Sequence, residues 1–236
     1  MSDILADFPA KLIRGDCLSV LRAMPSGGTD AIITDPPYGI DFQSGWCKAR
    51  KGKILNDRLP FIWWLWDAAR VLKDGGLLLC FCHWQTAEVF RLAIELAGLK
   101  IRGQLVWDKI DHGAGDTATC PAPQHELIWY ATKGRRVFPN GYRPTSVIRT
   151  LRVNGNVILH PNEKPIKLLQ ALIEDYTSPE EVILDPFAGS GTTGVAAASK
   201  RRNSISIELD RKYAEVARVR LATFQPGPAE CPLFQN

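Results

Sequence analysis

The chain has 236 residues, and 45% of them are hydrophobic, a size and composition that favour one large α/β domain over a disordered or fibrous chain. Its 29 Lys and Arg exceed its 25 Asp and Glu, and the net charge of +4 permits a nucleic-acid partner without requiring one. The longest apolar stretches fall short of the roughly 20 residues that cross a bilayer, which argues against a membrane protein.

The cysteines indicate a cytoplasmic protein. They stand at positions 17, 47, 80, 82, 120 and 231 and form no Cys-x-x-Cys pair, so we expect reduced thiols and no metal, with a zinc site as the alternative. The first residues lack a basic region followed by an apolar stretch, and we therefore expect no signal peptide.

Strands and helices are expected to alternate along the chain, which predicts a mainly parallel sheet. Among 60–72, three tryptophans (63, 64 and 66) are too closely spaced to lie on one side of a helix. The expected helices are 17–24, 60–72, 86–97, 166–176, 195–199 and 214–224. The expected strands are 11–16, 29–34, 77–81, 101–107, 126–131, 182–184 and 204–208.

The most informative stretch is 181–194, where a short apolar strand is followed by Asp185 and a glycine-rich turn. Gly189 and Gly191 permit backbone angles that other residues avoid. Thr192 and Thr193 are suited to cap the helix that follows. Because open α/β sheets bind nucleotide-like ligands where a strand feeds a helix, the turn predicts a binding site.

The residues around this turn narrow the range of ligands that it could bind. A Walker loop needs Lys after its last glycine, where Thr192 stands. The spacing of Gly189, Gly191 and Gly194 does fit a dinucleotide site, which remains an alternative. However, Asp185 would repel a pyrophosphate and accept hydrogen bonds from an ammonium group, and Glu208, at the end of the next strand, suits a ribose diol. The pattern favours a ligand with a cationic end and a ribose end, such as S-adenosylmethionine.

A second rigid tip follows the strand at 29–34. Here Asp35 precedes Pro36 and Pro37, which exclude a helix and would hold a reactive group in place. Two further stretches, 39–59 and 133–158, are rich in Lys and Arg and contain aromatic residues. Such residues suit nucleic acid, although solvated surface segments have the same composition.

Together, Asp35-Pro36-Pro37-Tyr38 and the later Asp-Pro-Phe-Ala-Gly-Ser-Gly-Thr-Thr at 185–193 resemble the amino-group DNA methyltransferases. The motif order is similar to that of their β-type permuted branch, and the resemblance extends from about Leu12 to Leu221. It implies one Rossmann-like catalytic domain over 1–236, with a circularly permuted motif order. The sheet would be mostly parallel and seven-stranded, with helices on both faces. The stretch 39–59 would be a mobile loop, and 133–158 would be a target-recognition insert.

The resemblance also implies roles for individual residues. Asp35 and the Pro36 carbonyl would accept the two N–H bonds of the target amine, and Tyr38 would stack on an extracted base. Lys164 would pair with the methionine carboxylate, and Asp16 would accept a hydrogen bond from the adenine amino group. The catalytic set is Asp35, Pro36, Pro37 and Tyr38. The cofactor set is Asp16, Cys17, Asp35, Lys164, Asp185, Phe187, Ala188, Gly189, Ser190, Gly191, Thr192, Glu208 and Leu209. The DNA-binding set is Lys48, Arg50, Lys51, Arg135, Arg136, Asn140, Arg143 and Arg149.

The implied function is site-specific methylation of adenine N6 in double-stranded DNA, with S-adenosylmethionine as methyl donor, by base flipping and direct in-line transfer without a metal. Asp rather than Ser at position 35 favours adenine by analogy with the family. Cytosine N4, RNA and a protein glutamine side chain stay open as alternative targets. The resemblance further suggests a restriction-modification context and a homodimer.

Overall fold

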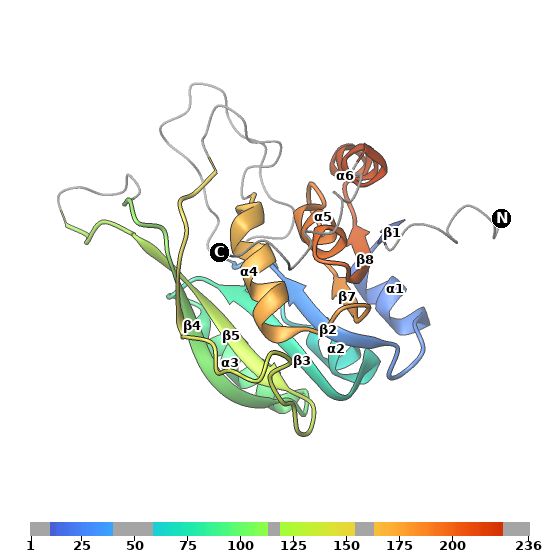
Figure 1. Cartoon of the computed structure of the whole chain (residues 1–236), viewed down its shortest axis with the longest axis horizontal. Helices are drawn as coiled ribbons and strands as arrows, with labels where there is room; N and C mark the ends of the chain where they lie inside the picture. The colour runs from blue at the N-terminus through green and yellow to red at the C-terminus, as the bar shows by residue number, and fades with distance from the viewer. Residues whose placement is uncertain (1–9, 40–58, 113–118, 154–162, 224–236) are drawn as a thin grey trace, which may run out of the picture.

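The computed structural model describes residues 10–39, 59–112, 119–153 and 163–223. Within these residues eight strands form one sheet, in the order β1-β8-β7-β2-β3-β5-β4-β6 (Figure 1). The strands are β1 (Ala10–Arg14), β2 (Thr29–Thr34), β3 (Leu72–Cys82), β4 (Lys100–Asp108), β5 (His125–Thr132), β6 (Val147–Arg149), β7 (Val182–Asp185) and β8 (Asn203–Glu208). All neighbours are parallel except β5, which runs antiparallel to both β3 and β4.

The mostly parallel sheet is confirmed, but the expected count of seven strands was one too low. The additional strand is β6, whose three residues pair with the end of β4. It lies inside the basic stretch 133–158, where the dense Arg residues obscured any apolar alternation.

Helices cover both faces of the sheet, as expected. They are α1 (Cys17–Ala23), α2 (Leu65–Val71), α3 (Ala87–Leu96), α4 (Ile166–Tyr176), α5 (Thr192–Ser199) and α6 (Arg211–Thr223). One buried cluster contains side chains of α1, α2 and α3, and a second contains side chains of α4 and α5. Figure 1 shows these two layers on opposite sides of the sheet, with α6 beside α5.

Strand β3 explains why the central strands read as uninterrupted apolar runs. Leu78, Cys80 and Cys82 point into the cluster with α1, α2 and α3. The alternate residues Leu77, Leu79 and Phe81 point into the cluster with α4 and α5. Because successive side chains of a strand alternate between faces, a strand covered on both faces needs apolar residues at every position.

The helix expected over 60–72 is shorter in the structure and begins only at Leu65. Its expected first turn is instead irregular, and the Trp64 indole N–H donates to the Phe61 carbonyl at 2.9 Å. Trp64 is fully buried, whereas Trp63 is 66% exposed and stacks on Trp66. The prediction that the three tryptophans do not lie on one side of a helix is therefore confirmed. Trp64 is buried in a turn, and the helix does not extend back to Pro60.

The next element also differs from expectation. Strand β3 starts at Leu72 rather than at residue 77, so the stretch 73–76, directly after the helix expected over 60–72, lies within the strand. The pairing of β3 with β2 shifts register here: Thr29 opposes Leu72 and Ala31 already opposes Leu77. Gly75, with φ at +79°, supplies the conformation that this irregularity needs.

The sheet order decides where the two sequence motifs meet. Strand β7, which comes late in the chain, lies between β8 and the early strand β2. Since β2 and β7 are parallel, their carboxyl ends reach the same edge of the sheet. The turns after Thr34 and Asp185 therefore lie next to each other, although they are 151 residues apart.

Among the residues that the structure describes, no helix has both the length and the apolar character needed to cross a membrane.

The tryptophans provide a matched test of the packing. Trp64→Ala is expected to lower the free energy of unfolding by about 3–5 kcal/mol, because a fully buried indole leaves a cavity. Trp63→Ala, two-thirds exposed, should cost less than about 1 kcal/mol. Urea denaturation followed by circular dichroism measures both, and similar losses for the two variants would contradict the packing described here.

Candidate active site

Four neighbouring strands each bring a carboxylate to the same edge of the sheet. Glu208 and Asp185 are the last residues of β8 and β7, Asp35 directly follows β2, and Asp16 follows β1 by two residues. The strands are consecutive in the sheet, with Arg14 opposite Glu208 and Asp185 opposite Ser206. The structure thus aligns acids from both ends of the chain along one rim.

The glycine-rich turn connects this rim to α5. Gly191 has φ at +79°, and a Cβ there would lie 2.9 Å from the Ala217 Cβ of α6, so the position requires glycine. Helix α5 begins at Thr192 with Gly191 as its cap residue and without a side-chain cap bond. The expectation that Thr192 and Thr193 cap the helix was wrong, because both lie inside its first turn.

Glu208 holds this turn in place while keeping part of its carboxylate available. Its Oε2 accepts the Gly189 N–H at 2.7 Å, and its Oε1 accepts the Asp210 N–H at 2.8 Å. Burial raises the pKa of Glu208 above its ordinary value. Each carboxylate oxygen has a second lone-pair direction, so Glu208 can still receive a diol, as a bound ribose requires. The acceptor oxygens of Glu208 fit the ribose of S-adenosylmethionine at this point.

Asp16 and Cys17 lie beside Glu208. Asp16 caps α1 by accepting the Ser19 N–H at 3.0 Å, and Gly15 donates to the Glu208 carbonyl at 2.9 Å. Burial, and then the Asp16 charge, raises the pKa of the Cys17 thiol to about 12, so this thiol stays protonated. Leu209, directly after Glu208, is 51% exposed.

Asp185 is buried at the centre of the rim. Its Oδ1 accepts the Thr34 hydroxyl at 2.7 Å and the Phe187 N–H at 3.1 Å, which ties the glycine turn to β2. Burial raises the pKa of Asp185 to about 6, against the hydrogen bonds that favour the charged form. Phe187 contacts the rings of Trp64 and Phe61 edge-on, with centroids 5.4 Å and 6.0 Å away. Phe187 is thus part of the core as well as of the rim.

Asp35 belongs to a compact buried network. Its Oδ2 lies 2.8 Å from the Lys164 Nζ, and its Oδ1 accepts the Tyr38 hydroxyl. The same ammonium lies 2.9 Å from Glu126 Oε2, and Glu126 Oε1 lies 2.8 Å from the Lys109 Nζ. Burial raises the pKa of Asp35, whereas the carboxylates of Asp35 and Glu126 keep the pKa of Lys164 above its usual value. The pairing of Lys164 with the methionine carboxylate stays a prediction, since Lys164 here contacts side chains of the protein.

A second network links the glycine turn to the segment that carries Lys164. The Arg220 guanidinium of α6 donates to the Ser190 carbonyl at 3.0 Å, to the Ser190 Oγ at 2.8 Å and to the Thr192 Oγ1 at 3.0 Å. It also lies 2.9 Å from the Glu163 carboxylate. Because Glu163 directly precedes Lys164, the cofactor turn and the Asp35 network share one support. Ala188 is held separately, by donation of its N–H to Ile207.

The predicted DNA-binding residues that the structure describes do not form one cluster. Lys48, Arg50 and Lys51 lie outside the described residues, as does most of the 39–59 stretch. Arg136 bonds Tyr176 and Glu181, and Asn140 bonds the Glu174 carbonyl, all at the end of α4 or before β7.

Arg135 lies near Gly75, in the early part of β3. These three positions lie at the opposite edge of the sheet from Asp35, because the segment after β5 starts there. Of the described residues in this set, Arg149, at the end of β6 and paired with Asp108, is placed at the Asp35 edge by the strand register. Arg143 is exposed.

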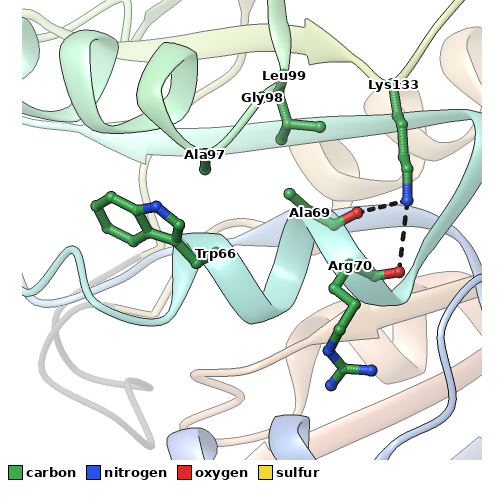
Figure 2. Close-up of a pocket in the computed structure, with 7 residues that line it drawn as sticks. All are labelled: Trp66, Ala69, Arg70, Ala97, Gly98, Leu99 and Lys133. Carbon is green, nitrogen blue, oxygen red and sulfur yellow. Dashed lines mark hydrogen bonds between the residues drawn. The ribbon is translucent and has the colours of Figure 1, made fainter.

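A hollow lies between α2 and the end of α3, and Figure 2 shows the residues that line it. Lys133 lines it and donates to the carbonyls of Ala69 and Leu72, each at 2.8 Å, so its ammonium caps α2. Lys133 follows the far end of β5, about 23 Å along the strand from Glu126. The hollow is therefore separate from the site. No cluster of three or more His, Cys, Asp or Glu in the described ranges is arranged to hold a metal ion.

The fold and the two motifs define an α/β methyltransferase, and the comparisons agree. The sequence pattern of the N6/N4 DNA methylase family matches residues 29–219. The chain belongs to this family of DNA methylases, whose methyl donor is S-adenosylmethionine. The dinucleotide site that the glycine spacing had left open is thereby set aside.

Individual relatives extend over most of the chain. "Putative methylase YubD" of Escherichia coli K12 is 36% identical, with 92% of each chain aligned. The type II methyltransferase M.HinfI of Haemophilus influenzae is 26% identical, with 99% of this chain and 74% of that one aligned.

Solved structures share the fold at lower identity. M1.HpyAVI in complex with S-adenosylmethionine superposes with a TM-score of 0.71 at 23% identity, over 90% of this chain and 98% of that one. The cytosine-N4-specific PvuII DNA methyltransferase superposes with a TM-score of 0.68 at 17% identity, over 89% and 86%. The predicted Rossmann-like methyltransferase fold is confirmed.

Sequence reasoning missed Glu126, Lys109, Glu163 and Arg220. Glu126 could have attracted attention as an acid at the start of a buried strand. Its relevance depends on β5 running antiparallel, which brings the start of β5 to the edge where the other strands end. Arg220 had no comparable indication, since it is one of several Arg residues on a polar helix.

The buried Asp185 predicts a pH dependence of stability. Its folded-state pKa of about 6 exceeds the ordinary value of 3.8, so the folded protein binds the proton more tightly and stability is lost as pH rises toward 6. Asp185→Asn removes this loss. From pH 5 to pH 7.5 the unfolding free energy of the variant should improve by about 1 kcal/mol relative to wild type. Urea titrations at both pH values measure it, and a difference independent of pH would contradict the assignment.

Proposed function

We propose that the protein transfers a methyl group from S-adenosylmethionine to the N6 amino group of adenine in double-stranded DNA. Family membership supports DNA methylation, and Asp35 at the head of the Asp-Pro-Pro-Tyr motif supports adenine. The observation that carries the proposal is the bond between Thr34 and Asp185, which holds the Asp35 turn against the glycine turn. A methyl donor on one turn would thereby face an amine on the other.

The proposed chemistry rests on acceptors that the chain supplies. S-adenosylmethionine, when bound, provides an electrophilic methyl group on a positively charged sulfur. An exocyclic amine is a weak nucleophile because its lone pair is delocalised into the ring. Asp35 and the Pro36 carbonyl would accept its two N–H bonds and concentrate the lone pair on nitrogen. The amine proton would then leave through Asp35, whose raised pKa makes it a better base than an exposed Asp.

Base flipping is part of the same proposal, because the amine of a paired base is inaccessible in the duplex. Tyr38 would stack on the extracted base, and its ring already lies over the Lys164 ammonium at 5.5 Å. Glu208 and Asp16 would hold the ribose and adenine ends of the cofactor, with Cys17, Phe187 and the turn 188–192 around them. DNA contacts from Arg149, and from Lys48, Arg50 and Lys51, remain predictions. A homodimer and a cytoplasmic location also remain predictions, the first open to sedimentation analysis.

Cytosine N4 is the second candidate. It offers the same planar amine, and a cytosine-N4-specific enzyme shares the fold. RNA and a protein glutamine offer such amines as well, but membership of a DNA methylase family argues against them.

Transfer of tritium from labelled S-adenosylmethionine tests the proposal. Labelling of duplex DNA, followed by hydrolysis to nucleosides, is expected to yield N6-methyladenine. Label in N4-methylcytosine would instead identify the second candidate, and label only in RNA or protein would refute both.

Asp35→Asn is expected to lower the rate constant of methyl transfer by about 100-fold or more, because the amide is a weaker acceptor and cannot take the proton. Glu95→Gln is the matched control, since Glu95 pairs with Arg91 on the outer side of α3. Single-turnover labelling measures both variants. A rate for Asp35→Asn within threefold of wild type would remove Asp35 from the mechanism.

A further inference from the structure

The Lys164 ammonium is enclosed by two carboxylates and two rings. Its side chain is only 8% exposed, and its Nζ lies 2.8 Å from Asp35 and 2.9 Å from Glu126. The ring centroids of Phe81 and Tyr38 lie 5.2 Å and 5.5 Å from the same atom. A buried ammonium is stable only when paired, so its position depends on these two acids.

Both oxygens of Asp35 are already engaged. Tyr38 donates its hydroxyl to Oδ1, and Lys164 lies against Oδ2. Each oxygen keeps a second lone-pair direction, but an amine bound there shares the carboxylate charge with Tyr38 and Lys164 and therefore meets a weaker acceptor. If the Tyr38 ring turns to stack on a base, its hydroxyl leaves Oδ1, and the sharing with Lys164 remains.

Glu126 is an alternative partner for both the Lys164 ammonium and the Tyr38 hydroxyl. Its Oε2 contacts Lys164 at 2.9 Å and lies 3.4 Å from the Tyr38 hydroxyl. Its other oxygen is 2.8 Å from Lys109, which directly follows β4. Burial disfavours the charge on Glu126, but Lys164 and Lys109 together hold the pKa of Glu126 below its ordinary value. The two ammonium groups beside it thus favour the charged form of Glu126.

We propose that Glu126 is a positioning residue that holds the Lys164 ammonium, and receives the Tyr38 hydroxyl, while the target amine occupies Asp35. Charges alternate along the row Asp35, Lys164, Glu126 and Lys109, so Asp35 can exchange partners without leaving the ammonium unpaired. The inference rests on the proposed role of Asp35 and holds for either target base. The inference gives a residue of the antiparallel strand β5 a role in the reaction, although β5 contains neither of the two sequence motifs.

Glu126→Gln tests the inference. We expect the single-turnover rate constant to fall by about 10- to 100-fold, because Lys164 then stays on Asp35 and the amine is misplaced. Affinity for S-adenosylmethionine, measured by calorimetry without DNA, should stay within twofold of wild type. Glu126→Asp, which keeps the charge, should recover part of the rate, and Glu88→Gln on the exposed side of α3 is the control.

The pH profile supplies a readout that a general structural role would not move. Ionisable groups that face Asp35 come from several elements: Tyr38, Cys80, Cys82, Glu126, Lys164 and Asp185. Among them the negative charge of Glu126 raises the pKa of Asp35, so Glu126→Gln should shift the acid limb of the rate profile to lower pH. In a Lys164→Met background, Glu126→Gln should lower the rate by a smaller factor than it does in the wild-type background.

Two results would overturn the inference while wild-type labelling of DNA persists. One is a Glu126→Gln variant with the wild-type rate and pH profile. The other is an equal loss in Glu126→Gln and Glu126→Asp together with weaker cofactor binding, which would indicate structural damage. Absence of DNA labelling by the wild-type protein would instead overturn the proposed function, and this inference with it.

Discussion

The site depends on one buried ammonium. Lys164 is held between Asp35 and Glu126, and removing a charge of this kind from water is costly unless opposite charges replace the solvent. The three partners come from the end of β2, the start of β5 and the segment before α4. Their mutual requirement therefore fixes three distant parts of the chain at one point, beside the rim where the cofactor turn lies.

The permuted motif order is compatible with this arrangement because neighbouring strands of a sheet need not be consecutive in the sequence. Strand β7 inserts between β8 and β2, and the Thr34 hydroxyl reaches Asp185 across that junction. Arg220 and Glu163 add a second connection, from α6 through the glycine turn to the residue before Lys164. The glycine turn and the Asp35 turn are thus linked at two places, as the proposed in-line transfer would require.

Charge composition did not indicate which partners the individual basic residues contact. Arg136 and Asn140 belong to the densest basic stretch, yet both bind the end of α4 or its neighbourhood. An Arg can satisfy backbone carbonyls and a carboxylate inside the protein as readily as it can contact a phosphate, and sequence composition does not distinguish the two uses. Arg149 differs because β6 carries it to the edge where β4 ends.

The sequence by itself determined the element types, most of their boundaries, the mostly parallel sheet and the two motifs that identify the family. These follow from local patterns: apolar runs, glycine turns and the Asp-Pro-Pro rigidity around Asp35. Only the tertiary structure decided that β5 runs antiparallel, that β6 joins the sheet, and that Trp64 is buried where a helix was expected. The pattern of apolar residues along a strand indicates which of its faces are buried. It does not indicate whether the strand runs parallel or antiparallel to its neighbours. The pairing of Glu126 with Lys164 is a contact between residues far apart in the chain, which no local spacing encodes.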